Sequence, residues 1–187
     1  MSARRAAIRR ERAQRAKAQK SKTIEGKLER IRAKGINDGR NIAASVILEV
    51  LHDKYKFSEK KAYELLDCVG KESTKFDQEG TKFVVEFYAK KLWEKINSVD
   101  VYQDMKNIET QVYCVARDDL FVSAAAIMLT ALNELFGFSS NSKGTGRLDY
   151  IMEYCTNRYI ELLLDPEHKT ADYYIQKMKR KTGYDVQ

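Results

Sequence analysis

The segment from Ile42 to Phe57, IAASVILEVLHDKYKF, carries apolar residues on nearly every side of a helical wheel. A helix that is apolar all round must be buried on all sides, so this segment predicts a central core helix. A second segment, Ser123 to Phe138, reads SAAAIMLTALNELFGF and aligns with the first at a constant offset of 81 positions. Alanine, leucine and phenylalanine recur at matching places in the two segments. Two copies of one core helix predict two copies of a packing unit.

The composition fits a folded, all-helical protein. Of the 187 residues, 43% are hydrophobic and 10% aromatic, which is enough to build a buried core. The single proline favours helices, because prolines interrupt helical hydrogen bonding. Cys68, Cys114 and Cys155 form no CxxC pair and lie among apolar residues. They predict buried, reduced thiols of a cytosolic protein.

Turn and capping residues predict where the helices of the first unit begin and end. Gly35, followed by Asn37 and Asp38, predicts the end of a leading helix and a fresh N-cap for the core helix. Ser58 is placed to cap the helix after it. We expect about four helices in this unit, which spans residues 23–98.

The second unit, residues 99–187, predicts the same order. A leading helix runs from Val101 to Val115, and Asp118 or Asp119 is expected to cap the second core helix. Asp165-Pro166 should end the next helix, and Thr170 should begin the last one. The predicted fold is therefore all-α, with two tandem duplicated units of about four helices each, preceded by a basic N-terminal arm.

That arm, residues 1–22, holds the excess positive charge of the chain. It has nine basic residues and one acidic residue, a net charge of +8, whereas the whole chain carries +7 and the remainder therefore −1. With no apolar stripe to bury, the isolated arm should be disordered or fluctuating, although it is rich in helix-forming residues. The basic residues of the arm are Arg4, Arg5, Arg9, Arg10, Arg12, Arg15, Lys17, Lys20 and Lys22.

A run of this kind is suited to nucleic acid. Basic side chains that neutralise phosphates release counterions, which gives salt-dependent binding that does not read sequence. If the arm became helical on a polyanion, its charges would point all round the helix, which fits a groove better than a membrane surface. The alternative is a solvated tail that aids solubility or contacts acidic groups of a partner.

The second copy contains about five extra residues within Ser139–Gly146, SSNSKGTG, and loops added to a repeated frame often carry specific contacts. Lys143, Thr145 and Arg147 would lie where backbone amides at a helix N-terminus can receive a phosphate. A flexible loop without a ligand is the alternative.

The C-terminal segment offers a further basic patch. Lys177, Lys179, Arg180 and Lys181 lie close to Tyr173, Tyr174 and Tyr184 in the sequence. Positive charge beside aromatic stacking surface is what single-stranded nucleic acid can use. These lysines could equally be the polar face of a last helix.

No combination of residues predicts catalysis, a metal site or a cofactor. Glu49 and His52 have the E-x-x-H spacing of di-iron bundles, but Thr130 and Asn133 occupy the equivalent positions of the second unit. We therefore expect His52 to lie at the edge of a core helix. Motifs of hydrolases, zinc proteases and P-loop proteins are missing, so the protein is predicted not to be an enzyme.

The longest apolar run, Leu120 to Leu132, is shorter than the ~20 residues that cross a bilayer. No membrane span is expected. The cationic N-terminus lacks the apolar block of a secretory signal and the amphipathic face of a transit peptide. A cytoplasmic protein is predicted.

Two stretches resemble known families. Arg9-Arg10-Glu11-Arg12, followed by Lys17-Ala18-Gln19, resembles the arginine-rich RNA-binding peptides of lambdoid phage antiterminators, which implies a short helix that grips an RNA hairpin. The stretch Gly39–Asp67, after a basic leader, resembles small helical proteins of phages and mobile elements of Firmicutes. This second resemblance implies mobile-element biology, a setting that includes anti-CRISPR inhibitors.

These observations predict a non-catalytic phage or mobile-element accessory protein that binds nucleic acid or a nucleoprotein complex. The arm would grip phosphates and the helical body would select the partner. One alternative is an anti-CRISPR-type inhibitor acting on a guide-RNA nuclease complex. With this charge it would have to grip guide RNA, target DNA or the nucleoprotein surface. The other is a protein-interaction or assembly module without nucleic-acid contact. The choice between RNA and DNA and the oligomeric state stay open.

Overall fold

The computed structural model describes the backbone of residues 3–71, 79–96, 107–141, 143–166 and 168–184, and their side chains except at 3–21, 70–71 and 79–83. These residues form six helices and no strand, so the all-α prediction is confirmed. The helices are α1 (Ala3–Tyr55), α2 (Glu59–Lys71), α3 (Glu79–Ile96), α4 (Ile108–Phe136), α5 (Arg147–Leu164) and α6 (Ala171–Thr182).

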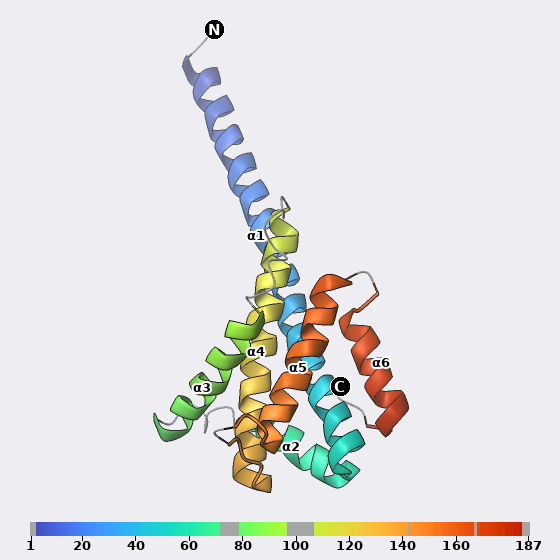
Figure 1. Ribbon diagram of the computed structural model, residues 1–187. Coiled ribbons are helices and arrows are strands. Elements are labelled where there is room, and N and C mark those ends of the chain that lie inside the picture. Colours follow the sequence, from blue (N-terminus) through green and yellow to red (C-terminus); the bar gives the residue numbers. More distant parts are fainter. Residues whose placement is uncertain (1–2, 72–78, 97–106, 142, 167, 185–187) are drawn as a thin grey trace.

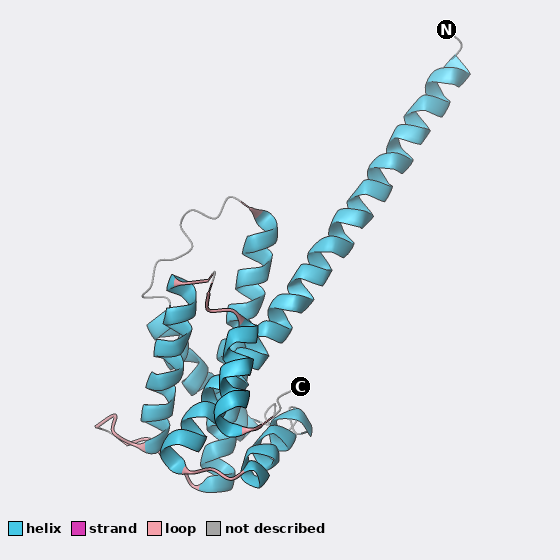
Figure 2. Ribbon diagram, turned by 90° about the vertical axis from the view of Figure 1, so that its right-hand side faces the viewer, coloured by secondary structure: helices cyan, strands magenta, loops and turns pink. Residues whose placement is uncertain are grey.

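Helices α1 and α4 lie side by side at the centre of the bundle and make its most extensive helix contact. Helix α3 packs against α4, α6 packs against α1, and α5 contacts both long helices (Figure 1). The N-terminal part of α1 projects beyond the bundle as a single helix in both views (Figures 1 and 2). With 53 residues at about 1.5 Å each, α1 is ~80 Å long.

Two glycines lie within α1 where it packs against α4. Gly35 and Gly39 lie inside the helix, so the predicted stop near Gly35 is wrong. A Cβ atom at Gly35 would lie 2.5 Å from the carbonyl oxygen of Tyr113, and one at Gly39 only 2.1 Å from that of Arg117. The glycines therefore allow close approach of the α1 and α4 backbones. Asp38, expected in an N-cap, instead accepts a 2.6 Å hydrogen bond from the Tyr113 hydroxyl of α4.

Helix α4 is also continuous where a boundary was predicted. Its N-cap is Asn107, whose side chain accepts a hydrogen bond from the amide of Glu109, so Asp118 and Asp119 are not caps. Residues 101–106 of the predicted leading helix lie outside the described residues. Asp118 is buried in mid-helix, 3.0 Å from the guanidinium of Arg117, and accepts a hydrogen bond from the Tyr159 hydroxyl. Pairing of this kind makes burial of a carboxylate tolerable.

Because it is continuous, α4 has 29 residues and by length and composition alone could cross a membrane. The run Leu120–Leu132 underestimated the length of this helix, since α4 continues beyond both ends of the run. The core helix of a bundle meets the same criteria. In this fold 56% of the most apolar window of α4 is buried, and the helix packs against α1, α3 and α5.

One hydrophobic core draws residues from all six helices. It includes the predicted core segments of α1 and α4, in which Ile47, Leu51 and Leu129 are fully buried. The three cysteines form no disulfide; Cys114 and Cys155 are buried and Cys68 is partly buried. Burial raises the pKa of the Cys155 thiol, so the protonated form is favoured.

The C-terminal ends of α1 and α4 have the same geometry. Lys56 and Gly137 follow the two helices with φ of 53° and 62°. The amide of Phe57 donates to the carbonyl of Leu51 at 3.1 Å, and that of Phe138 donates to the carbonyl of Leu132 at 3.2 Å. Each long helix is followed by two shorter ones, so three described helices replace the four expected in each half. In the described residues, each predicted leading helix is continuous with one of the two long helices.

Candidate nucleic-acid interface

The arm is the helical N-terminus of α1, which extends away from the bundle (Figure 2). The side chains of its predicted phosphate-binding residues Arg4 to Lys20 lie outside the described residues, whereas Lys22 is exposed. Nine cations over residues 4–22 of a helix amount to one positive charge per ~3 Å of axis. The phosphates of one DNA strand are spaced about 3.4 Å apart, so the two linear charge densities are similar.

At the base of the arm, α1 is tied to the start of α4. Lys27 donates a 2.6 Å hydrogen bond to Glu109, and the ammonium of Lys34 lies 5.9 Å from the centre of the Tyr113 ring. The Lys27 and Glu109 side chains are both exposed, so this pair adds little stability. It marks where α1 leaves the support of the bundle.

Two of the four cations of the predicted C-terminal patch form ion pairs within the protein. Lys177 and Lys181 lie 3.1 Å and 2.6 Å from the carboxylate of Glu49, and Lys181 also lies 2.9 Å from Asp53. Burial raises the pKa of Glu49, but the two ammonium groups outweigh it and hold the pKa below the ordinary value. These lysines fasten α6 to α1, because their charges compensate a carboxylate that is almost fully buried. The other two predicted residues of the patch, Lys179 and Arg180, are exposed.

The tyrosines near this patch are mainly core residues, contrary to the predicted stacking surface. Tyr174 and Tyr184 are only 1% and 3% exposed. The Tyr174 hydroxyl donates to the carbonyl of Arg158 at 2.7 Å, and that of Tyr184 donates to the carbonyl of Phe57 at 2.6 Å. Of the three tyrosines, Tyr173 alone is partly accessible, and it accepts a hydrogen bond from Lys169.

Several amides of the inserted loop, in its described residues, donate to side chains of the protein itself; position 142 lies outside those residues. The side-chain oxygen of Asn141 accepts hydrogen bonds from the amides of Lys143 and Thr145, at 3.1 and 2.9 Å. The carboxylate of Asp149 accepts from the amides of Asn141 and Gly146, both at 3.0 Å. These four amides are therefore not available to a phosphate. Lys143 and Arg147 remain exposed.

Arg147 instead contributes to a cavity of about 660 Å³ at the C-terminal ends of α1 and α4, which we call the basic hollow. Lys61 lies 5.7 Å from the centre of the Phe57 ring, and Arg147 lies 5.3 Å from that of Phe138. The basic hollow is lined by Lys54, Tyr55, Phe57, Lys61, Leu135, Phe136, Phe138 and Arg147.

The aromatic floor of the basic hollow is built from rings in edge-on contact. Phe57 lies edge-on to Phe136 with ring centres 4.8 Å apart, and Tyr55 lies edge-on to Phe138 at 5.1 Å. Phe57 and Phe138 are buried, whereas Tyr55 and Phe136 are half-buried and keep accessible surface. Burial raises the pKa of Tyr55, so its hydroxyl stays neutral. The floor is therefore an apolar surface with two accessible rings.

The rim of the basic hollow is uniformly positive. Lys54, Lys61 and Arg147 are exposed, and among the described residues no carboxylate lines the cavity and no ion pair involves these three cations. Lys54 lies 2.9 Å above the centre of the Tyr150 ring, a cation–π contact that leaves its charge uncompensated. Their situation contrasts with that of Lys177 and Lys181, whose charges are compensated within the protein.

Lys54 and Lys61 were missed from the sequence, where Lys61 reads as a solvent-facing helix residue. For Lys61, although not for Lys54, alignment of the internal repeat could have revealed the position. When the five-residue insertion is allowed for, Lys61 of the first copy aligns with Arg147 of the second, and Phe57 aligns with Phe138. A cation above a phenylalanine is thus present in both copies.

Glu49 and His52, the E-x-x-H pair, each contact charged residues of the protein. The Glu49 carboxylate pairs with two lysines, and the Nδ1 atom of His52 lies 3.2 Å from Asp53. The His52 ring also lies edge-on to that of Tyr184. In the part of the chain that the structure describes, no group of three or more His, Cys, Asp or Glu side chains is arranged to hold a metal.

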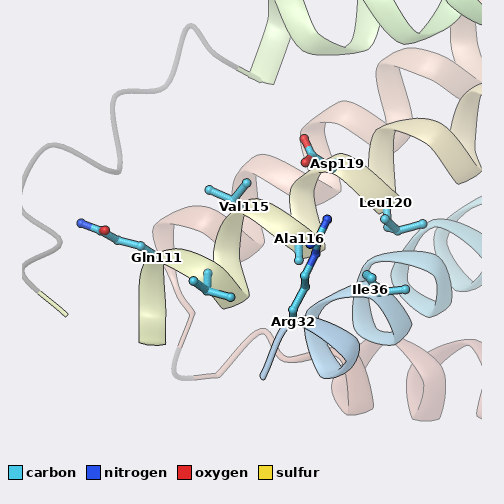
Figure 3. Close-up of a pocket in the computed structure, with 8 residues that line it drawn as sticks. Arg32, Ile36, Gln111, Val115, Ala116, Asp119 and Leu120 are labelled. Atoms are coloured by element: carbon cyan, nitrogen blue, oxygen red, sulfur yellow. The ribbon is translucent and has the colours of Figure 1, made fainter. Parts of the chain in front are cut away.

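A groove of about 350 Å³ lies between α1 and α4 below the arm (Figure 3). Arg32 and Ile36 come from α1, whereas Val115, Asp119 and Leu120 come from α4 (Figure 3). Among its described lining residues Arg32 is the single cation, and a carboxylate accompanies it, so the groove does not concentrate positive charge. It is mainly apolar and is bordered by Val115, which is 61% exposed.

Comparisons with protein-family models, curated protein sequences and solved structures find no match for this chain.

Proposed function

We propose that this protein is a non-catalytic accessory protein, of phage or mobile-element type, that binds nucleic acid or a nucleoprotein complex. The arm grips phosphates, and the helical body selects the partner. The observation that carries this proposal is the separation of charge. A segment of net charge +8 projects on the free end of α1, while the rest of the chain has a net charge of −1.

The geometry supports use of the arm on an elongated polyanion. A helix that leaves the bundle near Lys27 can lie in a groove without a clash with the body, because residues 3–22 extend away from it (Figure 2). Binding through phosphates depends on salt: each neutralised phosphate contributes about −0.9 to the slope of log K against log salt on duplex DNA.

Gel-shift titrations of duplex DNA, single-stranded DNA and RNA at rising salt test this proposal. The full chain should bind with a steep salt dependence, and a chain lacking residues 1–22 should lose most of the affinity and the slope. A full-length variant with Arg9, Arg10, Arg12 and Arg15 changed to Gln is the matched control for the loss of helix. Unchanged binding by both altered proteins would refute the role of the arm.

A protein-interaction or assembly module is the second candidate, and the apolar surface below the arm favours it. Ile24 of α1 and Ile108 and Val115 of α4 are 50%, 62% and 61% exposed, and Val115 lines the groove between the two helices. Exposed apolar surface of this kind is typical of protein contacts. Failure to bind any nucleic acid, together with capture of one acidic partner by the intact arm, would support this candidate.

We also infer that the protein is cytoplasmic and that its bundle arose by tandem duplication. The two copies would be α1–α3 and α4–α6. The matching ends of α1 and α4 support the duplication, as does the reciprocal packing of α3 on α4 and α6 on α1. A fragment of residues 23–98 should not fold alone if the copies depend on each other for their core, which circular dichroism can test.

A further inference from the structure

We propose that the basic hollow is a nucleotide site, which receives the phosphate and base of a nucleoside phosphate either free or as an unpaired residue of a strand. The strand-bound form rests on the proposed function, whereas the free form does not. The site lies at the other end of α1 from the arm. Between Lys22 and Lys54 the helix advances ~48 Å, so the two sites are physically separate.

The charges of the rim match a phosphate group. Lys61 and Arg147 approach from the first turns of α2 and α5, and Lys54 approaches from the last turn of α1. Arginine can hold a phosphate through two parallel hydrogen bonds, and lysine adds a compact charge. Since no carboxylate of the described residues lines the cavity, a phosphate would not be repelled or displaced by an internal anion.

The floor of the hollow matches a planar base. Tyr55 and Phe136 are half-buried rings beside the exposed side chain of Leu135, and the packed phenylalanines behind them fix their positions. Stacking on such rings does not depend on the identity of the base. A volume of about 660 Å³ lies within the range of small-ligand sites, so base, sugar and phosphate can be accommodated together.

The hollow forms only where the two halves of the chain meet. Phe57 and Lys61 come from the first half, and Phe138 and Arg147 come from the second. Lys54 breaks the symmetry, because Leu135 occupies the corresponding position of the second half. One side of the hollow is therefore more basic and the other more apolar, which would orient a ligand that has a charged end and a planar end.

Isothermal titration of the full chain with ATP and with a 5′-phosphorylated tetranucleotide tests the site. The double variant K61A/R147A should weaken binding at least tenfold. The control K60A/K90A removes the same amount of charge from exposed positions outside the hollow, and should bind within twofold of the original protein. Unfolding midpoints of both variants should match that of the original protein, since all four side chains are exposed.

The outcomes separate this proposal from that of the arm. Tight binding of ATP with weak binding of the tetranucleotide supports a free nucleotide, and the reverse supports a strand. The arm variant carrying four Gln substitutions should retain the hollow's affinity for ATP. Equal losses in the two double variants, no saturable binding of either probe, or preferential binding of a poly-glutamate peptide would each overturn the nucleotide site.

Discussion

Phe57 and Phe138 are 81 positions apart in the sequence, and their rings lie edge-on with centres 6.1 Å apart. Each follows the end of a long helix, and each carries a cation from the next helix above its ring. The contact brings equivalent parts of the two halves together at the floor of the basic hollow. The aromatic pair thus links the repeat seen in the sequence to a cavity that only the folded bundle contains.

We predict that Glu49→Gln lowers the free energy of unfolding at pH 7 by about 2 kcal/mol, because it removes a buried carboxylate that accepts two charge-assisted hydrogen bonds. Glu134→Gln, at an exposed position of α4, is the control and should change it by less than about 0.5 kcal/mol. Urea unfolding measures both. Equal effects of the two substitutions would show that the lysine pairing contributes nothing.

The same carboxylate predicts a pH dependence. Burial raises the pKa of Glu49, but Lys181 and Lys177 outweigh it, so the folded-state pKa lies below the ordinary 4.5. A lowered pKa means that the stabilisation is complete above pH 4.5 and is lost as the pH falls through the folded-state value. When unfolding is followed from about pH 7 to about pH 3, the free energy of unfolding should fall less for Glu49→Gln than for the original protein. Parallel curves would contradict the pairing.

Asp118→Ala should destabilise the fold by about 3 kcal/mol, because it leaves the buried guanidinium of Arg117 without its adjacent carboxylate. Asp119→Ala is the matched control, since this neighbouring residue is exposed and its loss should cost under about 0.5 kcal/mol. Thermal unfolding distinguishes them. A mild effect of Asp118→Ala would mean that the other contacts of Arg117, such as its hydrogen bond to the Tyr159 hydroxyl, are enough to stabilise the buried guanidinium.

Two glycines of α1 should respond in opposite directions to alanine. Gly39→Ala should destabilise the protein, because the new Cβ atom would lie 2.1 Å from a backbone oxygen of Arg117. Gly26→Ala should stabilise the helix by up to about 1 kcal/mol. Among the described residues no atom outside the local helix lies within 4 Å of the new Cβ atom, and alanine is the better helix former. Melting temperatures of the two variants provide the test. Stabilisation by Gly39→Ala would disprove the close approach of α1 and α4.

The ends of the two long helices predict another opposed pair. Gly137 has φ of 62°, so Gly137→Ala should cost about 1 kcal/mol. Lys56 has φ of 53° with a side chain, so Lys56→Gly should relieve strain and stabilise the protein by roughly 0.5 kcal/mol. Urea titrations measure both changes. Destabilisation by Lys56→Gly would indicate that the lysine side chain makes a contact of its own.

Local signals placed several helix boundaries correctly. Thr170 caps α6 by accepting a hydrogen bond from the amide of Tyr173, and Asp165 ends α5 before Pro166. Ser58 accepts from the amide of Lys61 at the start of α2. These predictions succeeded because capping depends on chemistry within four residues of the chain.

The predicted boundaries at Gly35 and Asp118 failed for the opposite reason. Both residue types interrupt isolated helices, yet each is stabilised here by a residue distant in the sequence. The backbone of Gly35 packs closely against that of Tyr113, and Asp118 accepts a hydrogen bond from the hydroxyl of Tyr159, 41 positions further along the chain. A contact between elements can reverse the local preference of a residue, and the sequence pattern of a single segment does not contain that information.

The sequence by itself determined the helical class, the two core helices, the cysteines without disulfides and the concentration of positive charge in residues 1–22, since each follows from composition or from periodicity within one segment. Only the tertiary structure decided which cations are compensated. It paired Lys177 and Lys181 with Glu49 and left Lys54, Lys61 and Arg147 around a common cavity. Electrostatic compensation depends on distances of a few ångströms between residues that the chain brings together only when it folds.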